Sequence, residues 1–250
     1  MARDDDERLG EVMKQVELEG VKIKVGSWQE WLEELERHWG EFWGVAPIAL
    51  HPLVVAKRDK EFKEVLKAID SVLPDSVWHR WLIWWRFREK ASSRFYGPEL
   101  MRGLIQWLGQ KRGKVWLFGG KNERQMKRLE KWVKQVDKRV EVESLIASNP
   151  VKDEEVERLV KLVGEEKGVV FLGIGSPRQQ ELVLKLRDLG LKVPVVAVGA
   201  AFDFWSGEKK ICPSWLRRLG LEWLWRLIQE PKRLGRRYWQ TFKWLVVNLS

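Results

Sequence analysis

A short apolar segment, residues 71–73, is typical of a buried strand and leads into Pro74 and Asp75. A carboxylate at such a strand end, in a partly apolar cleft, can have its pKa raised toward neutrality and can then exchange a proton with a bound ligand. Arg94 follows later in the chain, and its planar guanidinium suits a bidentate contact with phosphate. These residue types therefore permit proton transfer beside a bound phosphate group.

Glycine turns follow two further apolar segments, where backbone amides at a helix start could hold a diphosphate. The first turn is Gly119-Gly120, and Asn122 is the expected cap of the next helix. Taken alone, however, a glycine turn at this place is more typical of simple chain reversal.

The second turn, Gly173-Ile174-Gly175, leads into Ser176-Pro177, which suits the N-cap and the first residue of a helix. The amides of Arg178 and Gln179 would then lie in an exposed first turn. No third glycine completes the Gly-x-Gly-x-x-Gly spacing of dinucleotide sites, so an NAD-dependent enzyme is disfavoured.

Short apolar strands alternate with helical segments along most of the chain. These elements must position Asp75, Arg94 and the glycine turns. A capping box at Ser27 begins one helix, and Asp59 and Pro98 begin two others. The pattern predicts an α/β fold: a Rossmann-like parallel sheet with helices on both faces, which binds ligands beyond the carboxyl ends of its strands. Expected strands span residues 21–25, 45–50, 71–73, 114–118, 140–142, 168–172 and 193–198, and further helices span residues 153–163 and 177–189.

Composition indicates an intracellular protein with one core. The chain has 250 residues, of which 44% are hydrophobic, enough for a single substantial core. Its one cysteine, Cys212, excludes an internal disulfide and suits a reducing cytoplasm. Residues 1–8 are charged where a signal peptide would be apolar, and no run of 18 apolar residues occurs. We expect a cytoplasmic chain that does not span a membrane.

Most of the net charge of +10 lies near the C-terminus. Residues 208–250 hold ten Lys or Arg against three Glu, and five of the 17 tryptophans. Basic side chains mixed with tryptophan suit an anionic membrane surface, although the same mixture could bind single-stranded nucleic acid. We predict two parts, a core of residues 1–207 and a basic helical appendage of residues 208–250.

Two motifs in residues 199–238 carry a family resemblance. The first is Gly199-Ala-Ala-Phe-Asp203-Phe-Trp-Ser-Gly207, and the second is Glu222-Trp-Leu-Trp-Arg226-Leu-Ile-Gln-Glu-Pro231. This tract resembles the WecG/TagA/CpsF family of bacterial glycosyltransferases, whose members move an N-acetylhexosamine-type sugar from UDP to a lipid-diphosphate acceptor. The resemblance extends from about Val45 to Tyr238 and is weakest in residues 76–93.

The resemblance gives roles to individual residues. Leu73-Pro74-Asp75 matches the motif whose aspartate is the general base, and Arg94 would bind phosphate. Gln179 would contact substrate, against the alternative that it only completes a helix cap. Asp203 would bind the ribose or the uracil edge, against the alternative of an N-cap or a tight turn. The expected substrate-binding set is His51, Arg94, Gln179, Asp203, Gly119, Gly120, Gly173, Gly175 and Gly199.

This chain departs from the family pattern near the expected base. Ala49 and His51 stand where most members have Thr-x-Asn, Ser76 replaces a glycine, and Ile211 replaces a basic residue. His51 could still donate a hydrogen bond to sugar or phosphate. An enzyme with changed sugar specificity, or a weakened one, stays open.

Four tryptophans lie between Asp75 and Arg94. Trp78, Trp81, Leu82 and Trp85 are expected to share one helical face flanked by arginines, as in a helix at a membrane interface. The alternative is a helix packed on the sheet.

The basic tail is expected to fold as two helices, Pro213 to Arg218 and Glu222 to Gln229, with Pro231 as the stop. By resemblance, this appendage completes the acceptor site and attaches the enzyme to the membrane. The alternative is a helical pair with a solvated basic face. The arginines expected to face phosphates are Arg217, Arg218, Arg226, Arg233, Arg236 and Arg237.

Three histidines and one cysteine without metal-binding spacing predict no metal site, and no cofactor is expected. The sequence therefore predicts an inverting, metal-independent glycosyltransferase at the inner face of the cell membrane. Its expected partners are a UDP-sugar donor, a polyprenyl-diphosphate-linked acceptor and anionic lipid, but not nucleic acid, and homo-oligomerisation is left open. The alternatives are a catalytically impaired homologue that binds lipid or protein and, ranked lower, a nucleic-acid-binding protein.

Overall fold

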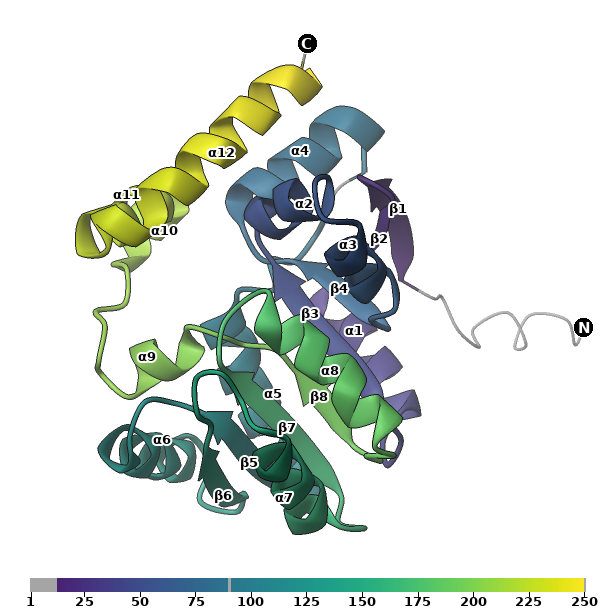
Figure 1. Ribbon diagram of the computed structural model, residues 1–250, viewed down its shortest axis with the longest axis vertical. Helices are drawn as coiled ribbons and strands as arrows, with labels where there is room; N and C mark the ends of the chain where they lie inside the picture. The colour runs from purple at the N-terminus through teal and green to yellow at the C-terminus, as the bar shows by residue number, and fades with distance from the viewer. Residues whose placement is uncertain (1–12, 90, 250) are drawn as a thin grey trace, which may run out of the picture.

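The central feature of the computed structural model is a six-stranded parallel sheet (Figure 1). The model describes residues 13–89 and 91–249, and only the backbone of residues 218, 248 and 249. The strand order is β4-β3-β8-β7-β5-β6. The strands are β3 (Trp43–Ile48), β4 (Ser71–Pro74), β5 (Lys114–Gly119), β6 (Glu141–Ile146), β7 (Gly168–Gly173) and β8 (Pro194–Val196).

Helices cover both faces of the sheet, so the predicted α/β fold class is confirmed. Alternate residues of a strand point to opposite faces, and Leu117 and Phe118 accordingly belong to two different hydrophobic cores. One core contains residues of α2 (Leu50–Ala56), α3 (Lys60–Lys67), α7 (Asp153–Val163) and α8 (Arg178–Asp188). The other contains residues of α1 (Trp28–Arg37), α5 (Gly97–Lys111), α6 (Glu123–Val136) and α9 (Ala201–Trp205).

Local sequence signals placed most helix starts correctly. The Ser27 capping box is present, and the side chains of Asp59 and Asn122 cap α3 and α6. Ser176 is not a cap: α8 has Pro177 as its N-cap residue and no side-chain cap. The expected strand at residues 45–50 ends at Ile48 because Leu50 already begins α2.

The expected strand at residues 21–25 forms, but outside the parallel sheet. β2 (Val21–Val25) pairs antiparallel with β1 (Lys14–Leu18), a strand that the sequence analysis missed. The charged stretch of residues 1–8 lies outside the described residues.

The C-terminal helices lie beside α2 and α4 (Val77–Phe87) at one end of the molecule (Figure 1). They are α10 (Ser214–Arg218), α11 (Glu222–Gln229) and α12 (Pro231–Leu249). The expected helix at residues 222–229 is confirmed and ends before Pro231, but Pro231 also begins α12, a helix that was not expected. Helix α12 packs on α2, and its Trp244 is buried in the core and donates a hydrogen bond to Glu19 at 3.0 Å. The boundary at residue 207 stays a prediction.

No helix in the described part of the chain combines the length and the apolar character that crossing a bilayer requires.

Candidate functional site

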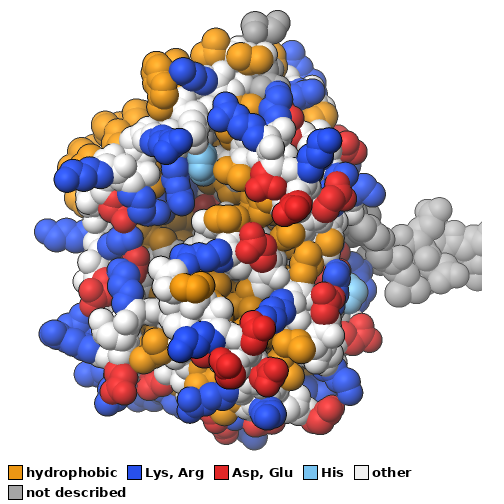
Figure 2. Space-filling model, viewed as in Figure 1, with side chains coloured by type: hydrophobic (Ala, Val, Ile, Leu, Met, Phe, Trp, Pro, Cys, Tyr) orange, Lys and Arg blue, Asp and Glu red, His pale blue; other side chains and the backbone are white. Residues whose placement is uncertain are grey.

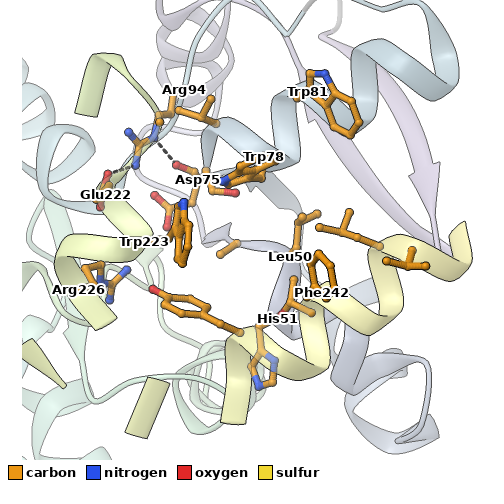
Figure 3. Close-up of a pocket in the computed structure, with 18 residues that line it drawn as sticks. Leu50, His51, Asp75, Trp78, Trp81, Arg94, Glu222, Trp223, Arg226 and Phe242 are labelled. Atoms are coloured by element: carbon orange, nitrogen blue, oxygen red, sulfur yellow. Dashed lines mark hydrogen bonds and ion pairs between the residues drawn. The ribbon is translucent and has the colours of Figure 1, made fainter. Parts of the chain in front are cut away.

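Two neighbouring cavities open beyond the carboxyl ends of the strands. The first, of about 210 Å³, is lined by loops that follow β3, β7 and β8; we name it the polar cavity. The second, of about 460 Å³, lies between α4 and α11–α12; we name it the apolar cavity (Figure 3). The two cavities share five of their lining residues, which are Ala49, His51, Asp75, Arg226 and Tyr238. Both cavities thus lie at the end of the sheet where ligand binding was predicted.

Asp75 lies where the two cavities meet. Its backbone N–H donates to Ile48 O at 3.0 Å, and its Oδ1 accepts from the Gly97 N–H at 3.3 Å. Burial raises the pKa of Asp75 to about 6, although the Arg94 charge opposes the rise. A carboxylate with this pKa is ionised at neutral pH and can still accept a proton, which is what general base catalysis requires.

Arg94 contacts Asp75 and a residue of the C-terminal helices. Its Nε donates to the Asp75 carbonyl oxygen at 2.6 Å, and its Nη2 lies 2.5 Å from Glu222 Oε2 (Figure 3). The guanidinium also lies over the Tyr96 ring, 4.5 Å from its centroid. Arg94 lines the apolar cavity, and its charge is already paired.

His51 lies in the first turn of α2 and lines both cavities. Its Nδ1 is buried and accepts or donates no hydrogen bond among the described residues. Burial and the nearby Arg237 charge lower the pKa of His51 to about 4, so the ring is neutral at physiological pH. A neutral imidazole with an unpaired ring nitrogen can hydrogen-bond a sugar hydroxyl.

Gln179 joins two loops of the polar cavity. Its Oε1 accepts from the Gly175 N–H at 3.1 Å, and its Nε2 donates to Ala197 O at 3.2 Å. Gly175 and Gly199 line this cavity with φ angles of +86° and +52°, which favour glycine. With His51, four of the expected substrate-binding residues therefore line the polar cavity.

The other expected glycines line neither cavity. A Cβ on Gly119 would lie 2.8 Å from the Gly173 backbone, and one on Gly173 would lie 2.2 Å from the Phe202 ring. Close packing between β5, β7 and α9 therefore accounts for these two residues. Gly120, with a φ of +76°, continues the turn after β5.

Asp203 lies within α9 and is neither a helix cap nor a lining residue of either cavity. Its carboxylate lies 2.6 Å from Lys209 Nζ and 2.9 Å from Lys121 Nζ, and accepts from Gln125 at 3.1 Å. Burial acts to raise its pKa, but the two lysines hold the pKa below its usual value.

Three of the expected arginines, Arg226, Arg233 and Arg237, line the polar cavity. Burial and the charges of Arg233 and Arg226 lower the pKa of Arg237, as expected where like charges crowd together. Basic side chains border a hollow on the face shown in Figure 2. This crowding suits an anionic ligand.

The remaining expected arginines lie elsewhere. Arg217 pairs with Glu99 of α5, Arg236 is exposed, and the side chain of Arg218 lies outside the described residues.

The tryptophan helix α4 is amphipathic, but its faces differ from the expectation. Leu82 is fully buried, whereas Trp78, Trp81 and Trp85 are exposed. The C-terminal helices expose further apolar side chains on the same part of the molecule. They are Trp215, Leu219, Trp223, Leu224, Ile228, Trp239, Phe242, Val246 and Val247.

Glu222 and Phe242 are among the lining residues that were not expected from the sequence. Glu222 belongs to a quoted motif, but no local signal pairs it with Arg94, which is distant in the chain. Phe242 lies on α12 and lines the apolar cavity. The helical spacing of Leu234, Tyr238, Thr241 and Leu245 could have revealed that helix.

No group of three or more His, Cys, Asp or Glu side chains within the described residues is arranged to hold a metal ion. Metal independence stays a prediction.

Comparison with known proteins identifies the family. The glycosyl transferase WecG/TagA/CpsF family model matches residues 16–249. Two similar proteins are N-acetylglucosaminyldiphosphoundecaprenol N-acetyl-beta-D-mannosaminyltransferases. The one from Bacillus spizizenii (strain W23) is 28% identical over 72% of this chain and 69% of that protein. The one from Bacillus subtilis (strain 168) is 26% identical over 82% of this chain and 80% of that protein. Because the family model covers almost the whole chain, this protein belongs to the WecG/TagA/CpsF family and is a glycosyltransferase.

Proposed function

We propose that this chain transfers N-acetylmannosamine, or a similar N-acetylhexosamine, from UDP to a sugar on polyprenyl diphosphate. The observation that carries the proposal is the position of Asp75 between a cavity of glycine loops and arginines and a cavity of tryptophan and aliphatic side chains. The names of the two Bacillus relatives support the choice of sugar and acceptor.

In the proposed reaction the UDP-sugar occupies the polar cavity. Arg226 and Arg237 neutralise the diphosphate together with the backbone amides near Gly175 and Gly199, so that no metal ion is needed. His51 donates a hydrogen bond to the sugar.

The acceptor presents a sugar hydroxyl to Asp75 from the apolar cavity. The hydroxyl oxygen attacks the anomeric carbon while Asp75 takes its proton. The new glycosidic bond forms as the bond to the β-phosphate oxygen breaks, and UDP leaves with that electron pair. A single displacement from the opposite side inverts the anomeric configuration.

The lipid tail of the acceptor requires contact with a membrane. We propose that the exposed tryptophans of α4 and the apolar side chains of α12 enter the inner face of the cell membrane, with arginines such as Arg236 at the headgroups. The protein would then be cytoplasmic and peripheral, and the apolar cavity would open toward the bilayer.

A transfer assay with purified full-length protein tests the proposal. UDP-N-acetylmannosamine and N-acetylglucosaminyl-diphospho-polyprenol are supplied in chelator-treated buffer, and the disaccharide-lipid product is measured. Product of inverted configuration is expected, and a product of retained configuration would contradict the single displacement. UDP binding without turnover would support the catalytically impaired homologue, and a preference for single-stranded DNA over UDP-sugar would support the nucleic-acid alternative.

A further inference from the structure

Glu222 is a buried carboxylate in a cavity that is proposed to receive an anionic substrate. Only 10% of its side chain is exposed, and its Oε2 contacts Arg94 Nη2. A carboxylate repels a diphosphate, and the Glu222 carboxylate is already paired with Arg94. A buried ion pair also adds little net stability, since removing both charges from water costs about as much as their attraction returns. Neither attraction of the diphosphate nor added stability therefore explains why Glu222 lies in this cavity.

The contacts of Arg94 indicate what Glu222 does. One guanidinium joins Glu222 of α11 to the backbone carbonyl of Asp75, and the Tyr96 ring supports it from one side. The planar fork fixes both contacts at once, so a displacement of Glu222 would displace the loop that carries Asp75. Among the described residues, the Asp75 side chain accepts one hydrogen bond, from the Gly97 N–H.

We propose that Glu222 is a positioning residue: through Arg94 it fixes the loop of Asp75, so the base is aligned only when α11 lies against Arg94. The inference rests on the proposed function of Asp75. It assigns to the C-terminal helices a role in catalysis in addition to binding. Glu222 itself touches no reacting atom.

Glu222→Gln in the full-length protein tests the inference. We expect kcat to fall about tenfold because the loop of Asp75 loosens, with the KM for the UDP-sugar nearly unchanged. The charges that face Asp75 are Arg94, Glu222 and Arg226. Loss of the negative charge at Glu222 should therefore move the acid limb of the rate profile to lower pH.

Glu99→Gln is the matched control. It removes the ion pair between α5 and Arg217 of α10, which also ties a C-terminal helix to the core. Since that pair does not contact Arg94, the acid limb should stay in place. Arg94→Lys should reproduce the loss of kcat, and the double variant with Glu222→Gln should lose little more than either single variant, because both act through one connection.

Hydrogen exchange gives a readout without substrate. The Gly97 N–H, which donates to Asp75, should exchange faster in Glu222→Gln than in the parent or in Glu99→Gln. Parental exchange at Gly97, an unmoved acid limb, or additive losses in the double variant would each overturn the inference. A parent protein without transferase activity would refute the proposed function instead, and the exchange measurement would still decide the role of Glu222.

Discussion

The two cavities that meet at Asp75 are built from different parts of the chain and from different kinds of side chain. The polar cavity is formed by glycine loops at the ends of β7 and β8, closed by arginines of α11 and α12. The apolar cavity is formed by α4 and by another face of the same C-terminal helices, with Trp78, Trp81 and Phe242 in its walls. The C-terminal helices therefore place arginines around the polar cavity and, besides Glu222 and Arg226, mainly apolar side chains around the apolar cavity.

This difference suggests how one site can handle two unlike substrates. Backbone amides and arginines recognise a charged nucleotide, whereas apolar walls recognise a lipid-linked sugar. The five residues that line both cavities, which we name the shared wall, must serve both substrates. Asp75 is the one acidic side chain among them. Substitutions in the shared wall should affect transfer most, and those in one cavity should affect one substrate.

The largest effect is expected for Asp75→Asn in the shared wall. Transfer should fall about 100-fold or more, because asparagine cannot take the proton, while UDP binding stays near the parental value. Radiolabelled product formation and calorimetric titration with UDP measure the two quantities. Transfer at the parental rate would remove Asp75 as the base.

The same variant should not lose stability at pH 8. Because the folded-state pKa of Asp75 is raised from 3.8 to about 6, its ionisation costs folding free energy as the pH rises through this range. Asparagine avoids that cost, so the melting temperature at pH 8 should equal or exceed that of the parent.

The pH profile of the parent should show which group in the shared wall titrates. Since burial raises the pKa of Asp75 to about 6, kcat/KM should be about tenfold lower at pH 5 than at pH 7. His51, with a pKa of about 4, stays neutral over this range and does not contribute. A profile that is flat between pH 5 and 7 would contradict the assigned base.

A pair of arginine variants should separate the two cavities. Arg237→Lys alters the polar cavity and should weaken UDP binding about fivefold, because an ammonium cannot make bidentate contacts with phosphate. Arg94 does not line the polar cavity, so Arg94→Lys should leave UDP affinity near parental while lowering kcat. Titration with UDP measures the affinity of both variants. A larger loss of affinity in Arg94→Lys than in Arg237→Lys would place the phosphate site at Arg94.

Local signals in the sequence predicted the fold and the place of Asp75. A capping box, strand-like apolar segments and prolines act over a few residues, so they placed the start of α1, the span of α7 and the strand end at Asp75. The family motifs added Gln179 and the arginines of α11 and α12, three of which line the polar cavity.

Contacts between distant segments could not be predicted in this way. The pairing of Arg94 with Glu222 depends on where the C-terminal helices place α11 beside the loop that carries Arg94, and no periodicity encodes it. A glycine turn looks the same in sequence whether it packs against a neighbouring strand, as Gly119 does, or borders a cavity, as Gly175 does. Leu82 was predicted to share the tryptophan face but is buried. Helical spacing shows which residues are neighbours on a helix, but not which of them face the core.

The smallest effect is expected in the apolar cavity. Phe242 lines it and remains 57% exposed, so a lipid chain could cover part of its ring. Phe242→Ser should raise the KM for a long-chain polyprenyl acceptor about threefold, the amount expected from the loss of a partly covered aromatic side chain. UDP affinity should not change, because Phe242 is absent from the walls of the polar cavity.

Two comparisons make this small effect decisive. Leu189→Ser removes another exposed apolar side chain at the end of α8, outside both cavities, and should not alter the KM. A water-soluble acceptor with a short chain should not distinguish Phe242→Ser from the parent, because it cannot reach the substituted ring. An equal rise in KM for short and long acceptors would place the lipid chain elsewhere and leave the apolar cavity without its proposed substrate.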